Sequence, residues 1–117
     1  MLALGKRPRV YLSRVPTDMR CSFEGLSARA RSVIQQDPLS GHLFVFLNRK
    51  RDYIKVLYWD DGGYCIWSKR LERGTFELPT SDVQHIEIDA NHLLLMIEGI
   101  ALKSVKKRMR FALEKAD

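Results

Sequence analysis

The hydrophobic and polar positions of the 117-residue chain first follow the period of an α-helix. Apolar residues recur at three- and four-residue intervals over residues 19–34, which places them on one helical face. Thr17 or Asp18 can accept the first free backbone N–H groups of this helix. Asp37-Pro38 ends it, because proline disfavours the α conformation in the residue before it. A short strand is predicted before the helix, over residues 9–12.

The middle of the chain changes to a strand pattern. Residues 43–47 and 53–59 are rich in β-branched and aromatic residues and predict a hairpin with a basic tip at 48–52. Asp60-Asp61-Gly62-Gly63 tolerates the backbone of a tight turn and leads into a third strand over 64–70. One more strand is expected within residues 83–88. A second helix should follow it, with Asp89 as the N-cap and Gly99 as the C-terminal signal.

These elements together predict an α+β fold. An antiparallel meander sheet should pack against the N-terminal helix, followed by a second helix and a basic C-terminal tail. The chain length and its 45% hydrophobic residues suffice for one core. We expect residues 1–100 to form a single α+β domain. Residues 101–117 are expected to form a basic amphipathic tail, either as a helix or as a segment that orders on a partner.

The distribution of charge along the chain indicates which kinds of partner the protein could bind. The chain carries 20 Lys and Arg against 14 Asp and Glu, a formal charge of +6. Residues 49–73 hold seven basic and four acidic residues, whereas residues 74–100 hold five acidic residues and no Lys or Arg. A basic surface favours nucleic acid through counterion release. The acidic stretch either neutralises basic surface within the fold or leaves one face for a protein partner.

The cysteines and the N-terminus indicate the compartment. Cys21 and Cys65 lack metal-ligand spacing and do not make a disulfide scaffold, which fits a reducing cytosol. Lys6, Arg7 and Arg9 interrupt any apolar leader, and no stretch approaches the roughly 18 apolar residues of a membrane span. We therefore expect a soluble, cytoplasmic protein without a membrane partner.

The candidate DNA-binding residues are cations of the predicted meander. The hairpin tip and the end of the third strand hold most of them, and two lysines within the strands extend the stripe. The set is Arg49, Lys50, Arg51, Lys55, Lys69, Arg70 and Arg73. Contacts of this kind with phosphate give affinity without sequence choice. The alternatives are a solvated hairpin tip and, for Arg70 and Arg73, pairing with Glu72 or other internal carboxylates.

Five aromatic residues lie among these cations. Such a surface can stack bases, but packing under the N-terminal helix is the favoured interpretation. The residues are Tyr53, Tyr58, Trp59, Tyr64 and Trp67.

No motif predicts catalysis or a cofactor. The three histidines lack metal-ligand spacing, and no nucleophile elbow or phosphate-cradling loop occurs. Two-metal phosphodiester chemistry needs several converging carboxylates, whereas Asp18, Asp37 and Asp60 each have a local capping or turn role. Asp52 stands one residue too far from Lys55 for the usual acid-x-Lys arrangement of nucleases. The sequence therefore predicts no catalytic residue, no metal and no cofactor.

Five stretches carry a family resemblance over residues 10–79, with a weaker echo at 93–100. They are PTDMR at 16–20, FEGL at 23–26, DPLSGHLFVF at 37–46, IKVLYWD at 54–60 and KRLERGTF at 69–76. In them the chain closely resembles the accessory proteins TnpB, also called Orf2, of insertion-sequence family sixty-six. It departs from that pattern at Cys21, where a basic residue is usual, at Arg51, where glycine is usual, and at Asp61-Gly62, which looks reversed.

The resemblance implies a bacterial mobile-element protein that acts beside a separately encoded transposase, which would hold the catalytic site. Our hypothesis is a non-catalytic accessory factor that binds DNA or assists assembly of the transposase on transposon ends. A protein adaptor without DNA contact is one alternative. A metal-dependent nuclease using Asp37, Asp52 or Asp60 is the other. The resemblance leaves the DNA preference, the step of transposition and the oligomeric state open.

Overall fold

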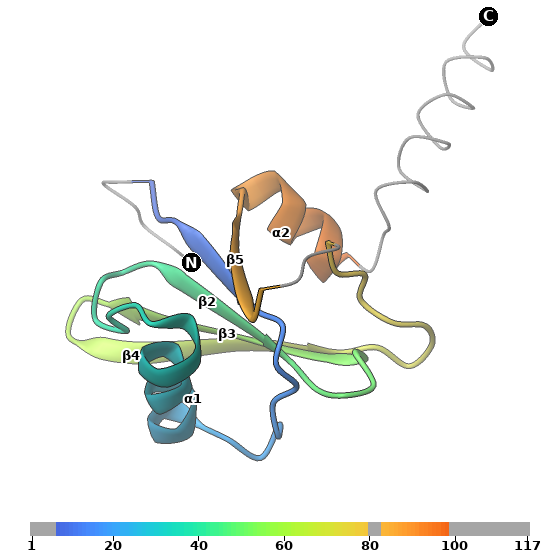
Figure 1. Ribbon diagram of the computed structural model, residues 1–117, viewed down its shortest axis with the longest axis horizontal. Coiled ribbons are helices and arrows are strands. Elements are labelled where there is room, and N and C mark those ends of the chain that lie inside the picture. The colour runs from blue at the N-terminus through green and yellow to red at the C-terminus, as the bar shows by residue number, and fades with distance from the viewer. Residues whose placement is uncertain (1–6, 80–82, 99–117) are drawn as a thin grey trace, which may run out of the picture.

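The computed structural model describes residues 7–79 and 83–98 and shows a five-stranded sheet with helices on both of its faces (Figure 1). The predicted α+β class is confirmed. The elements in chain order are β1 (Val10–Ser13), α1 (Phe23–Arg29), the π-helical η1 (Ala30–Ile34), β2 (Leu43–Leu47), β3 (Tyr53–Asp60), β4 (Gly63–Arg70), β5 (His85–Ile88) and α2 (Ala90–Ile97).

The predicted meander forms the larger half of the sheet. β2, β3 and β4 pair antiparallel in sequence order, as the hairpin and turn signals indicated. β1 then lies beside β2 in parallel, with Val10 opposite Leu43, and β5 pairs antiparallel with β1. The strand order is therefore β4-β3-β2-β1-β5, and the sheet is mixed rather than wholly antiparallel. A parallel pair needs a crossover connection, which α1 and η1 provide.

The first helix starts later than its apolar period predicts. The carboxylate of Asp18 accepts the backbone N–H of Arg20 at 2.9 Å and forms a turn instead of a helix cap. Short polar side chains offer the backbone this competing hydrogen bond, so the helix begins only at Phe23, after Ser22. Its predicted end is confirmed, because regular helical structure stops at Ile34.

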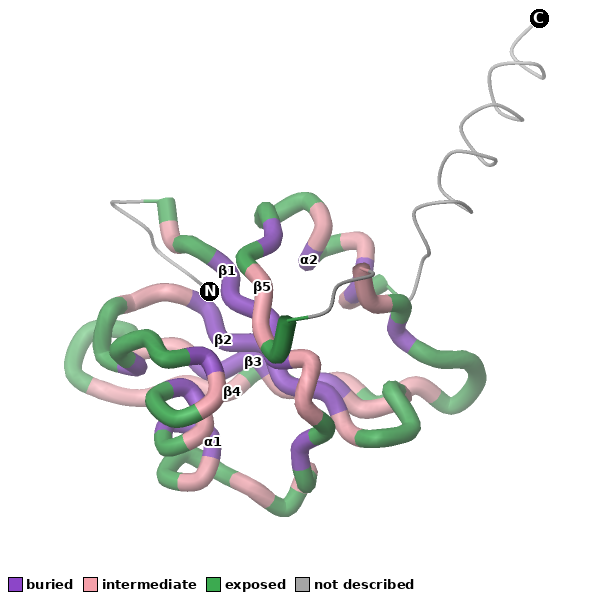
Figure 2. Tube along the Cα trace, viewed as in Figure 1, coloured by how far each residue is buried: buried purple, intermediate pink, exposed green. Residues whose placement is uncertain are grey.

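Both faces of the sheet are covered. α1 and η1 pack on one face, where Leu26, Ala30 and Ile34 are fully buried. On the other face lie α2, which contributes Leu93 and Met96, and the segment after β4. All residues of β1 and β2 are buried, as the central strands in Figure 2 show. The continuous apolar run of β2 is typical of a strand covered on both sides.

The ends of α2 are held by side chains. The predicted N-cap is confirmed, because the carboxylate of Asp89 accepts the backbone N–H of His92 at 2.7 Å. At the other end, Lys69 Nζ donates to the carbonyl of Ile97 at 2.7 Å, where a cation also faces the negative end of the helix dipole. The expected signal at Gly99 and the tail over 101–117 lie outside the described residues. So does the expected domain boundary after residue 100.

Within residues 7–79 and 83–98, no helix is both long and apolar enough to cross a bilayer.

Candidate nucleic-acid interface

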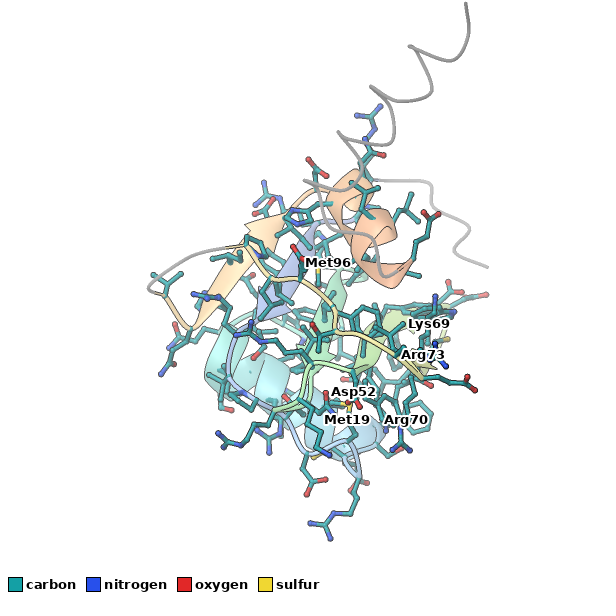
Figure 3. All side chains as sticks on the ribbon, turned by 90° about the vertical axis from the view of Figure 1, so that its right-hand side faces the viewer. Met19, Asp52, Lys69, Arg70, Arg73 and Met96 are labelled. Atoms are coloured by element: carbon teal, nitrogen blue, oxygen red, sulfur yellow. The ribbon has the colours of Figure 1, made fainter. Side chains whose placement is uncertain are left out.

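Most of the candidate contact residues gather at one end of the sheet. β1 and β2 run parallel, and β2 and β4 both run antiparallel to β3, so the final residues of β1, β2 and β4 lie at the same end of the sheet. Figure 3 views the molecule from this side and shows Lys69, Arg70 and Arg73 together at the end of β4. We call the following cations the basic end: Arg14, Arg49, Lys50, Arg51, Arg70 and Arg73.

A hydrogen-bond network shapes the hairpin tip that carries three of these cations. The side-chain oxygen of Asn48 accepts the backbone N–H groups of Asp52 at 3.0 Å and Tyr53 at 3.1 Å. Its amide donates to the Asp52 carboxylate at 2.6 Å. The backbone N–H of Phe76 then bonds the carbonyl of Arg51 at 2.7 Å and ties the segment after β4 to the tip. The tip is therefore a held turn, whose cations project from a fixed backbone.

Two neighbouring depressions lie among the cations of the basic end. The larger, of about 520 Å³, is lined by Arg49, Lys50 and Arg70, with Tyr53 and Asp18 also in its wall. The smaller, of about 220 Å³, is lined by three arginines and shares one of them with the larger. Those arginines are Arg14, Arg49 and Arg51.

Within the described chain, the cations of the basic end form no ion pair with an acidic residue. Among the described residues, the ion pairs join Arg9 to Glu87 at 3.9 Å and Arg20 to Asp18 at 2.6 Å. Neither pair includes a member of the basic end. Within the described chain, an anionic ligand would therefore not have to displace a carboxylate from these cations.

Two of the seven candidate residues have structural partners instead. Lys55 Nζ donates to the carbonyls of Met19 at 2.7 Å and Cys21 at 2.8 Å and fixes the segment before α1 on β3. Lys69 donates to Ile97, as described above. Direct DNA contact by these two lysines stays a prediction from the sequence. Because their ammonium groups are engaged by backbone oxygen, we leave both outside the basic end.

The aromatic residues divide between packing and the basic surface. Trp59 and Tyr64 contact each other edge to face, with ring centroids 5.0 Å apart, and burial raises the pKa of Tyr58. Trp67 is 39% exposed on β4. Tyr53 differs, because it lines the larger depression and its ring centroid lies 6.0 Å from the guanidinium carbon of Arg70. It is therefore the aromatic residue placed for stacking beside the cations.

The carboxylates considered for nuclease chemistry do not converge. Asp52 precedes β3 and Asp60 is its last residue, so the two are separated by about 26 Å at the usual strand rise of about 3.3 Å per residue. Asp37 accepts the backbone N–H of Leu39 at 2.9 Å in the turn after η1. Over residues 7–79 and 83–98, no three His, Cys, Asp or Glu side chains are grouped to hold a metal ion.

Asp18 is a negative charge in the wall of the larger depression. Hydrogen bonds from Arg20 hold its pKa at about 2, below its usual value of 3.8. The stabilisation from this lowered pKa is present above pH 3.8 and is lost as pH falls through about 2. The carboxylate therefore stays ionised at neutral pH and opposes an anion bound nearby.

We expect Asp18→Asn to raise DNA affinity about two- to fivefold at low salt, because one unit of repulsion is removed and Arg20 is released. Asparagine can still accept the backbone N–H of Arg20, so the turn should persist. Fluorescence anisotropy with a labelled duplex measures the change. Asp61→Asn, in the turn at the opposite end of β3, is the matched control and should leave affinity unchanged. Equal affinity of Asp18→Asn and the unmodified protein would contradict this placement of the charge.

Arg14 is the member of the basic end that sequence reasoning missed. It follows β1 directly, and its Nε atom is buried without a hydrogen-bond partner in the described structure. The only local signal is an arginine after a strand. Its position beside Arg49 and Arg51 follows from the parallel pairing of β1 with β2, which no local pattern announces.

Comparison with known proteins gives the family. The model of the family described as IS66 Orf2 like protein matches residues 8–107. The chain is 39% identical over 100 residues to the uncharacterized protein y4hO of Sinorhizobium fredii, covering 86% of this chain and 87% of that protein. It is 28% identical over 108 residues to the uncharacterized protein y4jC of the same species, covering 92% of each. No solved structure matches. The chain therefore belongs to the IS66 Orf2-like family, which has an accessory role in transposition.

Proposed function

We propose that this protein is a non-catalytic DNA-binding accessory factor, which contacts the phosphate backbone through its basic end and helps the transposase engage transposon ends. The observation that carries the proposal is the gathering of six cations at one end of the sheet. None of the six forms an ion pair with a carboxylate in the described chain. The family's accessory role in transposition supplies the process.

The dimensions of the basic end suit a nucleic-acid backbone. Its cations lie at the ends of β1, β2 and β4 or in the segments that follow them. With β3 in between, these are four adjacent strands, which at about 4.8 Å spacing span about 14 Å. Duplex DNA carries one charge per about 1.7 Å of its axis, so a surface of this width meets several phosphates at once. Phosphate contacts fix position and carry no sequence information. Choice of the transposon ends is therefore assigned to the transposase or to the shape of the DNA.

A salt-dependent binding titration tests the proposal. With six cations engaged, the logarithm of the association constant should fall linearly with the logarithm of salt concentration, with a slope approaching about −5. Duplexes carrying the element's terminal repeats are compared with unrelated duplexes of equal length. Similar slopes on both fit backbone contact. Absence of binding at low salt, or a slope near zero, would overturn the proposal.

A protein adaptor is the second candidate, and one observation favours it. Leu94 is 56% exposed on α2, in the part of the chain that also carries Glu87 and Glu98. Acidic side chains repel DNA, so this part of the chain suits a protein partner better than a phosphate backbone. Capture of the transposase that persists after nuclease treatment, by protein that fails the salt titration, would favour the adaptor.

A further inference from the structure

We infer that the smaller depression of the basic end is a phosphate-binding pocket, in which Arg14 contacts the ligand together with Arg49 and Arg51. The inference deepens the proposed function and rests on it, because it assigns one defined site for a phosphate group within a surface otherwise described only by its charge. Arg14 belongs to neither the hairpin tip nor the meander, so the pocket joins two separate parts of the chain.

The lining of the pocket has the chemistry of an oxyanion site. Its volume of about 220 Å³ admits a phosphate group with some of its hydrating water. Three of its described lining residues are arginines and none is a carboxylate. A guanidinium presents N–H donors in a planar fork that matches two oxygens of one phosphate, and it keeps its charge at any physiological pH.

Arg14 has an unused donor in this place. Its backbone N–H bonds the carbonyl of Gln84 at 2.7 Å, which fixes the main chain. Its Nε is buried and has no hydrogen-bond partner within the part of the chain that the structure describes. Buried N–H groups of folded proteins are almost always paired, and those of a cation cost most when they are not. With a turn of the side chain toward the pocket, a phosphate oxygen would supply the missing acceptor.

Arg51 is held in a backbone conformation that arginine rarely adopts. Its φ of 60° lies in the left-handed region, which glycine enters freely and side chains with a Cβ enter at a cost. Hydrogen bonds fix this backbone from both sides, since Arg51 N–H bonds the carbonyl of Asn48 at 3.1 Å and its own carbonyl accepts from Phe76. A strained residue that contributes a cation to a pocket indicates a role for its side chain.

The walls of the pocket are joined before any ligand arrives. The backbone N–H of Thr17 bonds the carbonyl of Leu47 at 2.8 Å, which links the segment after β1 to the end of β2. Arg14 and Arg49 follow these two strands closely in sequence. A site whose backbone is already fixed loses less entropy on binding than one whose walls must first be brought together.

Phosphate chemistry is shared by two sources in DNA. An internal phosphodiester carries one negative charge, whereas a terminal phosphate monoester carries close to two at neutral pH. Three guanidinium groups complement either one. Inorganic phosphate tests the shared chemistry, and duplexes with or without a 5′-phosphate separate the two sources.

The experiment follows the Nε–H signal of Arg14 by ¹⁵N NMR in the full chain, while inorganic phosphate replaces chloride at constant ionic strength. The signal is expected to shift and to saturate. Arg14→Met and Arg51→Gly, followed through the remaining arginine signals of the pocket, should each weaken phosphate binding about tenfold or more. Arg31→Met, at an exposed position on η1, is the matched control and should bind phosphate as the unmodified protein does.

The Arg51→Gly variant separates a loss of phosphate binding from a loss of folding. Glycine relaxes the left-handed backbone, so this variant should melt at or above the temperature of the unmodified protein while binding phosphate less tightly. A purely structural role of Arg51 predicts unchanged phosphate binding, and that result would overturn the inference. An unsaturable phosphate response, equal in Arg14→Met and the unmodified protein, would overturn it too.

Competition between inorganic phosphate and labelled duplexes identifies which kind of DNA phosphate the pocket binds. It also distinguishes failure of the pocket from failure of the proposed DNA-binding function. If phosphate displaces only a 5′-phosphorylated duplex, the pocket takes a terminal phosphate. Equal displacement of both duplexes assigns it an internal phosphodiester. Saturable phosphate binding without any DNA binding would leave the pocket in place and overturn the proposed function. Salt-dependent DNA binding that is unchanged in Arg14→Met and insensitive to phosphate would support the proposed function and overturn the pocket.

Discussion

Removing the three cations of the hairpin tip is expected to weaken DNA binding a few hundredfold at 0.1 M salt, and to make the salt slope shallower by about 2.7. The variant combines Arg49→Ala and Lys50→Ala with Arg51→Gly, because glycine suits the left-handed backbone at position 51. Each cation that neutralises one phosphate adds about 0.9 to the slope, so three contacts account for the change. Anisotropy titrations from 50 to 200 mM salt measure it.

A second triple variant separates position from total charge. Arg7→Ala, Arg29→Ala and Arg31→Ala together remove the same formal charge from residues outside the basic end. If contact is local, this control keeps nearly the full slope. Equal losses in the two triple variants would show that net charge alone draws the protein to DNA, and the basic end would lose its assigned role.

Lys55→Met is expected to lower the free energy of unfolding by about 2–4 kcal/mol while leaving the salt slope unchanged. The ammonium group donates to the carbonyls of Met19 and Cys21, and its removal leaves two acceptors without their charged partner. Methionine keeps the apolar stem, so the loss reports the hydrogen bonds rather than a cavity. Urea unfolding with an unchanged m-value measures the difference.

Lys50→Met is the natural comparison, since this lysine is exposed on the hairpin tip. Its stability should change by no more than about 0.5 kcal/mol, whereas its salt slope should fall by about 0.9. The two lysines should thus give opposite results in the two assays. A stable Lys55→Met variant with a shallower slope would return Lys55 to the DNA contact set.

Features encoded by neighbouring residues were predictable from the sequence. The apolar run of β2 and the Asp60-Asp61-Gly62-Gly63 turn led to the meander, and Asp89 was recognised as the cap of α2. The predicted start of α1 is wrong because Asp18 has two local hydrogen-bonding options, a helix cap and a turn. The sequence does not reveal which of them is the more stable.

The candidate site was predictable only in part, because charge is visible in a sequence and its partner is not. Lys50 and Lys55 look alike in the hairpin, yet one is exposed and the other bonds carbonyls of a segment more than 30 residues away. The sequence does not single out Arg14, for the complementary reason. Its place at the basic end depends on parallel pairing between strands that are separated by the whole of α1 and η1.

The position of β1 between β2 and β5 also sets the order in which the molecule can be assembled. The hairpins of the meander form from sequence neighbours, but β1 must wait for a parallel partner synthesised some 30 residues later and for β5 still further along. Closing such long loops slows folding. A nascent chain released from the ribosome only as far as the meander still lacks Gln84, whose carbonyl accepts the backbone N–H of Arg14, so tight anion capture should arise late in biosynthesis.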